Sequence, residues 1–166
     1  MSDDEYFWEP VEGCGNVRAR GPSTAPLQGG SGAFTIDFEF PEPNPPPVTT
    51  IAWRLAHLVI GIFGSRAAEH FGGPEVAYES FDYAGSASQA LDQLDQAYGR
   101  WIRGVGGLTH DDLGRPCGED GFAERSMAAL VLHINREAIH HCGEIALLRD
   151  LYARGGAATL PPEGAP

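Results

Sequence analysis

The chain has 166 residues, of which 42% are hydrophobic, and this is enough for one domain with a single buried core. Its 23 acidic residues outnumber its 11 lysines and arginines, and the formal net charge of -12 argues against a nucleic-acid groove or an anionic membrane surface. The three cysteines lack C-x-x-C spacing, so neither a disulfide framework nor a thiolate zinc knuckle is indicated. No secretory signal or membrane span is recognisable in the sequence. We therefore expect a soluble, cytoplasmic protein with a small-molecule partner.

Residues 1–47 are rich in glycine and proline and predict an irregular arm without long helices. Phe34, Ile36, Phe38 and Phe40 alternate with polar residues, which is typical of a short extended segment with one apolar side. Because aromatic side chains need a surface to pack on, we expect the arm to be held against the rest of the protein rather than to be a disordered tail. The prolines of residues 43–47 predict a stiff spacer.

Two long helices are predicted after the arm. The first begins at a capping Thr49 or Thr50 and ends before Gly72. Residues 75–85 read as a connecting loop. The second helix follows Ser86, which forms a capping-box signature with the glutamine three residues later, and ends near residue 104 or 106. A short helical turn capped by Thr109 is predicted next, with an exposed His110.

The third long helix is predicted from about Ala123 to Tyr152, because apolar residues recur at steps of three and four along it. Glu137 and His141 lie one turn apart on its inward side, so both side chains can bind one metal ion or one substrate atom. Residues 156–166 read as a flexible tail. The predicted domain is therefore an arm (1–47), a helical bundle (48–155) and this tail.

An open divalent-metal site needs about three histidine or carboxylate ligands. His57 is the only histidine placed on an inward face of another helix, because His70 lies at a helix end and His110 in a loop. His133 is eight residues from His141, roughly 12 Å along the helix axis, so these two could share an ion only in a nearly linear arrangement. The site predicted from spacing is His57, Glu137 and His141. The alternative is that His57 is a satisfied core histidine.

Other polar residues of the third helix have two interpretations. His140 and Glu144 could orient a ligand or transfer protons, or could simply face solvent. Arg136 could bind a carboxylate of a substrate or cofactor, although a helix exterior normally carries such residues. Cys142 points about 100° away from its neighbour His141, which favours a small packed residue over a catalytic thiol.

The segments TTIAWRLAHL and LVLHINREAIHHCGEIALLRDLY resemble the DinB/YfiT-like superfamily of helical metalloproteins. The resemblance covers roughly residues 48–154, and its more specific part is the ending from His141 to Glu144. It implies an all-α, up-and-down helical bundle in which His57, Glu137 and His141 bind a divalent metal. Zinc is expected first, with nickel, manganese and iron as alternatives. Many members have histidine at the position of Glu137, and glutamate there is similar to the mycothiol-dependent maleylpyruvate isomerase branch.

The resemblance also implies an activity, that of an S-transferase or isomerase in which the metal lowers the pKa of a low-molecular-weight thiol such as mycothiol or bacillithiol. Two other functions stay open. The protein could bind metal or a small molecule without catalysis, as a stress-response or dimeric scaffold protein, or it could be a metal-assisted hydrolase. Family members usually have four helices and only three long helices are apparent here, so the first family helix would be missing. An uncovered apolar surface would then favour a homodimer.

Overall fold

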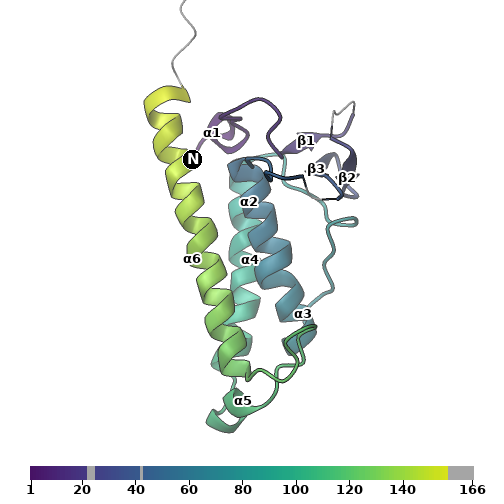
Figure 1. Cartoon of the computed structure of the whole chain (residues 1–166), viewed down its shortest axis with the longest axis vertical. Coiled ribbons are helices and arrows are strands. Elements are labelled where there is room, and N and C mark those ends of the chain that lie inside the picture. Colours follow the sequence, from purple (N-terminus) through teal and green to yellow (C-terminus); the bar gives the residue numbers. More distant parts are fainter. Residues whose placement is uncertain (22–24, 42, 157–166) are drawn as a thin grey trace, which may run out of the picture.

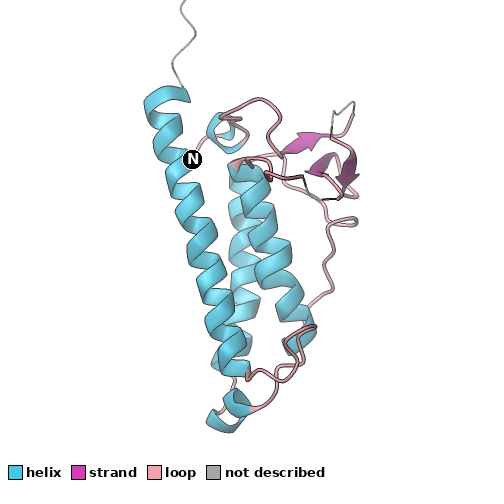
Figure 2. Cartoon of the chain, viewed as in Figure 1, coloured by secondary structure: helices cyan, strands magenta, loops and turns pink. Residues whose placement is uncertain are grey.

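The structure is a computed structural model that describes residues 1–21, 25–41 and 43–156, and the predicted tail lies outside the described residues except for Gly156. Figures 1 and 2 show three long helical segments side by side, with the arm at one end of them. The arm contains α1 (Asp3–Tyr6), β1 (Val17–Ala19), β2 (Leu27–Gly29) and β3 (Phe34–Phe38). The helical part contains α2 (Ile51–His57), η1 (Leu58–Gly64), α3 (Ser65–Phe71), α4 (Ala87–Gly106), α5 (His110–Gly114), α6 (Met127–Leu151) and η2 (Tyr152–Gly156).

The expectation of an all-α fold is confirmed in part, since the protein is mostly helical, but the arm is not irregular throughout and forms a three-stranded antiparallel sheet in the order β1-β3-β2. Val17 pairs with Ile36, and Leu27 pairs with Phe38. The protein is therefore mostly helical with a small sheet. The extended segment predicted around Phe34 is confirmed as the central strand β3.

The apolar side of β3 is confirmed for Phe34, Ile36 and Phe38, which belong to the core or pack against it. Phe40, beyond the end of β3, is 83% exposed, and Thr35 and Asp37 on the opposite side of the strand are also buried. The Asp37 side chain can be buried because the Arg18 guanidinium lies 2.7 Å from its carboxylate and the backbone N–H of Asn16 also donates to it. Both faces of this strand are thus covered.

The first long helix begins and ends as predicted. The Thr50 hydroxyl accepts a hydrogen bond from the backbone N–H of Trp53, and Gly72 terminates the helix with a left-handed φ of 73°. The sequence did not predict that the middle of this helix, η1, is a π-helix, a form that is often found at functional sites. The predicted helix thus consists of α2, η1 and α3 in direct succession.

Thr50→Ala is expected to lower the free energy of unfolding by about 1–2 kcal/mol, because the hydroxyl both caps α2 and donates to Oδ1 of Asn16 at 2.7 Å. Thr49→Ala is the matched control, since the buried Thr49 hydroxyl has no hydrogen-bond partner among the described residues. Urea unfolding of both variants checks this. Equal losses of stability would contradict the assigned role of the Thr50 hydroxyl.

The predicted second helix is confirmed as α4, capped by Ser86, and the predicted turn after Thr109 as α5. The third helix begins at Met127 rather than near Ala123, because Ser126 caps it and a loop that includes Gly121, with φ of 74°, precedes it.

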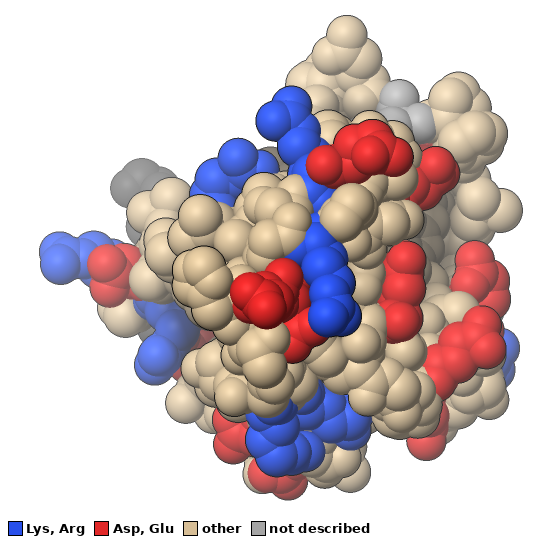
Figure 3. Space-filling view, turned by 90° about the horizontal axis from the view of Figure 1, so that it is seen from below, with Lys and Arg blue, Asp and Glu red and all other residues tan. Residues whose placement is uncertain are grey.

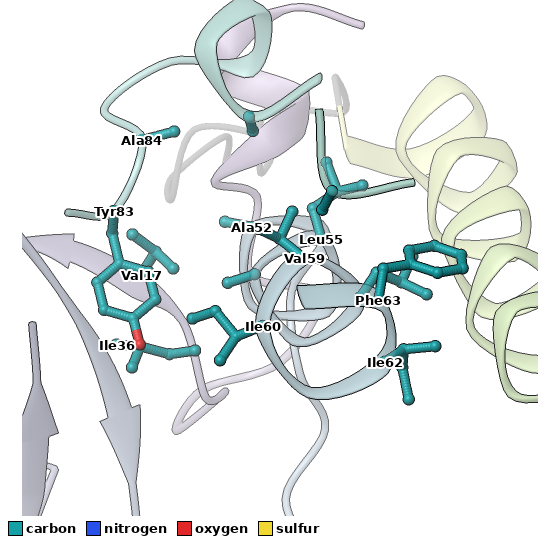
Figure 4. Packing of buried hydrophobic residues seen from close by; sticks show 14 of the residues in the cluster. Val17, Ile36, Ala52, Leu55, Val59, Ile60, Ile62, Phe63, Tyr83 and Ala84 are labelled. Atoms are coloured by element: carbon teal, nitrogen blue, oxygen red, sulfur yellow. The ribbon is translucent and has the colours of Figure 1, made fainter. Parts of the chain in front are cut away.

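The core lies where α2 and η1 contact both α4 and α6. Figure 4 shows Phe63 of η1 pointing toward α6, while Ile36 and Tyr83 pack on another side of the helix. Its largest fully buried side chain is Trp101 of α4. The helix formed by α2, η1 and α3, which we call the central helix, is therefore enclosed by the sheet, α4 and α6.

Among the described residues, no helix is long and apolar enough to cross a membrane. On the face seen from the lower end of the molecule, acidic and basic side chains are interspersed (Figure 3).

Candidate metal centre

His57 and His141 meet between two helices. His57 is the last residue of α2, and His141 lies on the side of α6 that packs against α2 and η1. Their ring centroids are 4.7 Å apart with the ring planes at 80°. The structure therefore brings together the two histidines that the sequence placed on inward faces, one from each helix.

Each of these rings uses its Nδ1 atom in a hydrogen bond. Nδ1 of His57 lies 2.6 Å from the hydroxyl of Tyr78, and Nδ1 of His141 lies 2.9 Å from a carboxylate oxygen of Glu144. A carboxylate partner fixes the proton of His141 on Nδ1 and leaves the lone pair on Nε2. In both rings Nε2 is the atom that remains to bind a metal.

Tyr78 was missed by sequence reasoning, because it lies in the loop between α3 and α4, where no periodicity marks an inward residue. It reaches His57 beside Gly61 of η1, where a Cβ atom would lie 2.4 Å from the tyrosine hydroxyl. The Tyr78 ring is buried, which raises its pKa to about 12 and keeps the hydroxyl protonated at neutral pH. Tyr78 thus acts on His57 as a neutral hydrogen-bonding group.

The electrostatic surroundings keep His57 neutral. Burial, and next the neighbouring His141, lower the pKa of His57 to about 4, although the carboxylate of Glu137 acts in the opposite direction. An imidazole that is neutral at pH 7 has the lone pair that a metal ligand requires. The alternative, a core histidine packed between Trp53 and Tyr78, agrees with the same contacts, so the metal role stays a prediction.

Glu137 lies one turn before His141 and is partly exposed. Its carboxylate accepts a hydrogen bond from Arg136 at 2.9 Å, and this bond, together with nearby positive groups, lowers the pKa of Glu137. A guanidinium nitrogen of Arg136 also lies 2.7 Å from Nδ1 of His133. Arg136 and His133 thus both contact Glu137 on α6. Glu137 is consequently an ionised carboxylate whose contacts are with Arg136 and His133, and its charge raises the pKa of His57.

Glu144 contacts more than one neighbour. It forms an ion pair with Arg54 of α2 and lies 3.5 Å from the exposed His140. Potential ligand atoms of His140, His141 and Glu144 all lie within 4.8 Å of one another, which forms a second possible ligand set on α6 alone. His141 thus belongs to this compact group on α6, whereas of the predicted set His57, Glu137 and His141 only the two histidine rings are in contact.

A family model for the DinB superfamily matches residues 1–145. The chain belongs to the DinB superfamily. No curated protein and no solved structure matches it. The match includes the arm, which lies outside the region of residues 48–154 that carried the sequence resemblance, so in this DinB-superfamily protein the sheet is part of the family region.

The donor set is chemically suited to the metal that DinB superfamily members often bind. Imidazole and carboxylate groups are ligands that zinc and similar divalent ions accept. Tyr78 and Glu144 orient the two rings through hydrogen bonds to Nδ1, as the hydrogen-bond partners of histidine ligands do in metal sites. The residues present therefore fit the group that the family implies.

Two other residues of this DinB-superfamily protein differ from expectation. Cys142 is exposed, so the interpretation as a small packed residue was wrong. His70, set aside as a helix-end residue, is partly buried, and its ring lies 3.1 Å from the Glu119 carboxylate. Arg66 also pairs with Glu119, so this cluster joins α3 to the loop before α6.

Proposed function

We propose that this protein binds one divalent metal ion, zinc in the first place, through His57, Glu137 and His141, and uses it in a thiol-dependent transfer or isomerisation of a small electrophile. The observation that carries the proposal is the facing pair of imidazoles from α2 and α6, each held through Nδ1 and each with Nε2 left for a metal. A divalent cation at these ligands would lower the pKa of a low-molecular-weight thiol, such as mycothiol or bacillithiol, so that its thiolate forms near neutral pH.

The chain's own residues supply the remaining steps of the proposed reaction. His140 is exposed beside Glu144, which suits it to accept the proton of the thiol and pass it to solvent. The thiol sulfur then forms a bond to an electrophilic carbon, and the leaving group departs with the electron pair of its bond. Arg136, at the outer side of Glu137, is placed to bind a carboxylate of the thiol or the substrate.

The first test is the metal content of tag-free protein purified without chelators, measured by elemental analysis. We expect one divalent ion per chain in the unaltered protein and its loss in His57→Ala and His141→Ala. His110→Ala is the matched control, because the His110 side chain is fully exposed at the start of α5 and the variant should keep its metal.

Other outcomes separate the alternatives. Metal retained in His57→Ala but lost in His141→Ala would assign the ion to His140, His141 and Glu144 and overturn the site across two helices. A protein without metal that takes up no added zinc or nickel would contradict the metal proposal and favour a scaffold.

If metal binds, mycothiol and bacillithiol are tested with a fluorogenic electrophile such as monochlorobimane. A metal-loaded protein that does not accelerate either reaction would be a metal-binding protein only.

A further inference from the structure

A cavity of about 830 Å³ lies where the arm meets the start of α2. Its walls consist of residues of the arm together with Thr49 and Trp53, and neither His57 nor His141 lines it. Its volume is within the range of cavities that hold small molecules in proteins. The structure thus contains a concave site that the proposed function does not use.

Acidic side chains determine the charge of this cavity. Among the described residues its lining contains the carboxylates of Glu9, Glu12, Asp37 and Glu39 and a single basic residue, Arg18. Arg18 is already engaged, because its guanidinium forms ion pairs with Glu9 at 2.5 Å and with Asp37 at 2.7 Å. The carboxylates therefore outnumber the cation, and the lining has a formal net negative charge.

Two of these carboxylates are available to a ligand. Glu12 and Glu39 are exposed, and neither forms an ion pair within the part of the chain that the structure describes. The acidic groups of the cavity are too far apart for a compact metal site, since the described groups of three ligands that could hold an ion lie elsewhere, on α6 and around Glu119. Carboxylates spread over a cavity of this size suit an organic cation instead.

Aromatic side chains form part of the apolar lining. Phe38 and Trp53 both line the cavity and contact each other edge to face, with ring centroids 6.0 Å apart. The Trp53 indole N–H donates to the carbonyl of Asp37 at 3.0 Å, which fixes the ring. Gly15 leaves space beside this ring, because a Cβ atom there would lie 3.5 Å from it. Aromatic rings close to carboxylates are typical surroundings for a bound ammonium group.

A polar group in the wall also lacks a partner. Thr49 is 8% exposed, and its buried hydroxyl has no hydrogen-bond partner among the described residues. A ligand that donates a hydrogen bond would account for this unsatisfied oxygen. A protonated amine has both the positive charge and the N–H donors that these surroundings require.

We propose that this cavity binds an organic cation, a protonated amine with an apolar body. Its ammonium group lies among the carboxylates, and its body packs on Phe38 and Trp53. An anion of the same size is excluded because the carboxylates repel it. The inference does not depend on metal binding or on catalysis, although Trp53 connects the two places, since its indole also stacks on His57 with centroids 5.4 Å apart.

The test is isothermal titration calorimetry with three probes of similar size: phenethylammonium, neutral 2-phenylethanol and anionic 3-phenylpropanoate. We expect one phenethylammonium ion to bind per chain with a Kd of about 1 mM or lower. The alcohol should bind at least tenfold more weakly, and the anion should not bind. Equal affinities for the cation and the alcohol, or no binding of phenethylammonium, would overturn the proposal.

Glu12→Gln combined with Glu39→Gln should weaken the binding of phenethylammonium by about five- to tenfold, because two exposed charges of the lining are lost. Glu75→Gln combined with Glu124→Gln is the matched control, since both carboxylates are exposed outside the cavity and the net charge changes equally. This control should bind like the unaltered protein.

Two further outcomes would also overturn the proposal. An equal loss of affinity in both double variants would trace binding to the overall charge of the protein rather than to the cavity. Displacement of phenethylammonium by an equal concentration of magnesium chloride would assign the carboxylates to a metal ion.

Discussion

Gly61→Ala is expected to lower metal affinity 10–100-fold while it leaves the free energy of unfolding nearly unchanged. The added Cβ would lie 2.4 Å from the hydroxyl of Tyr78 and 3.0 Å from the ring of His57, so the hydroxyl must move away from Nδ1. The lost hydrogen bond costs about 1 kcal/mol, and the better helix propensity of alanine offsets a similar amount. Titration with zinc against a competing chelator, together with urea unfolding, measures both quantities.

Gly143→Ala is the control for that prediction. Gly143 also lies in a helix, two residues from His141, but an added Cβ there would meet no atom within 4 Å. The variant should gain about 0.5–1 kcal/mol of stability and keep its metal affinity. If both glycine variants bind zinc with the affinity of the unaltered protein, the hydrogen bond between Tyr78 and His57 does not orient His57 for metal binding.

Trp101→Ala is expected to lower the free energy of unfolding by about 3–5 kcal/mol. Trp101 is 1% exposed and its ring contacts Phe71, so its removal leaves a cavity where α4 packs on the central helix. For a chain of this size the loss corresponds to a decrease in Tm of about 10 °C. Thermal unfolding followed by circular dichroism provides the measurement.

The control for Trp101 is an aromatic residue outside the core. Phe122 lies in the loop before α6 and is exposed, so Phe122→Ala should change the free energy of unfolding by less than about 0.5 kcal/mol. A loss of under about 1 kcal/mol for Trp101→Ala would mean that α4 is not held by the packing described above.

The helices could be predicted because their signals are local. Thr50 and Ser86 cap their helices through their own side chains, and Gly72 ends the first helix by its left-handed backbone, so a few neighbouring residues determine each boundary. The sheet could not be predicted in the same way. Its pairs join residues far apart in the chain, such as Val17 and Ile36, in strands of three to five residues that carry little periodicity.

The candidate site was predicted as far as helical spacing allows. Spacing placed Glu137 and His141 on one side of α6 and indicated His57 as an inward residue, and the structure brings the two histidines together. Tyr78 was not predicted, since its position depends on the course of a loop and on the missing side chain of Gly61. The exposure of Cys142 was missed because spacing gives the direction of a side chain but not whether another element lies there.

The contact between α1 and α6 joins residues that are synthesised at very different times. Glu5 and Arg149 are 144 positions apart, yet their side chains pair at 2.7 Å. Translation at about 5–20 residues per second separates their appearance by roughly 7–30 s. Other contacts of this segment do not need α6, because Phe7 stacks on Phe34 and the Tyr6 hydroxyl donates to the carbonyl of Ala84. The N-terminal segment can therefore dock before α6 is made, and its pairing with Arg149 is a late event that fastens α6 to a segment already in place.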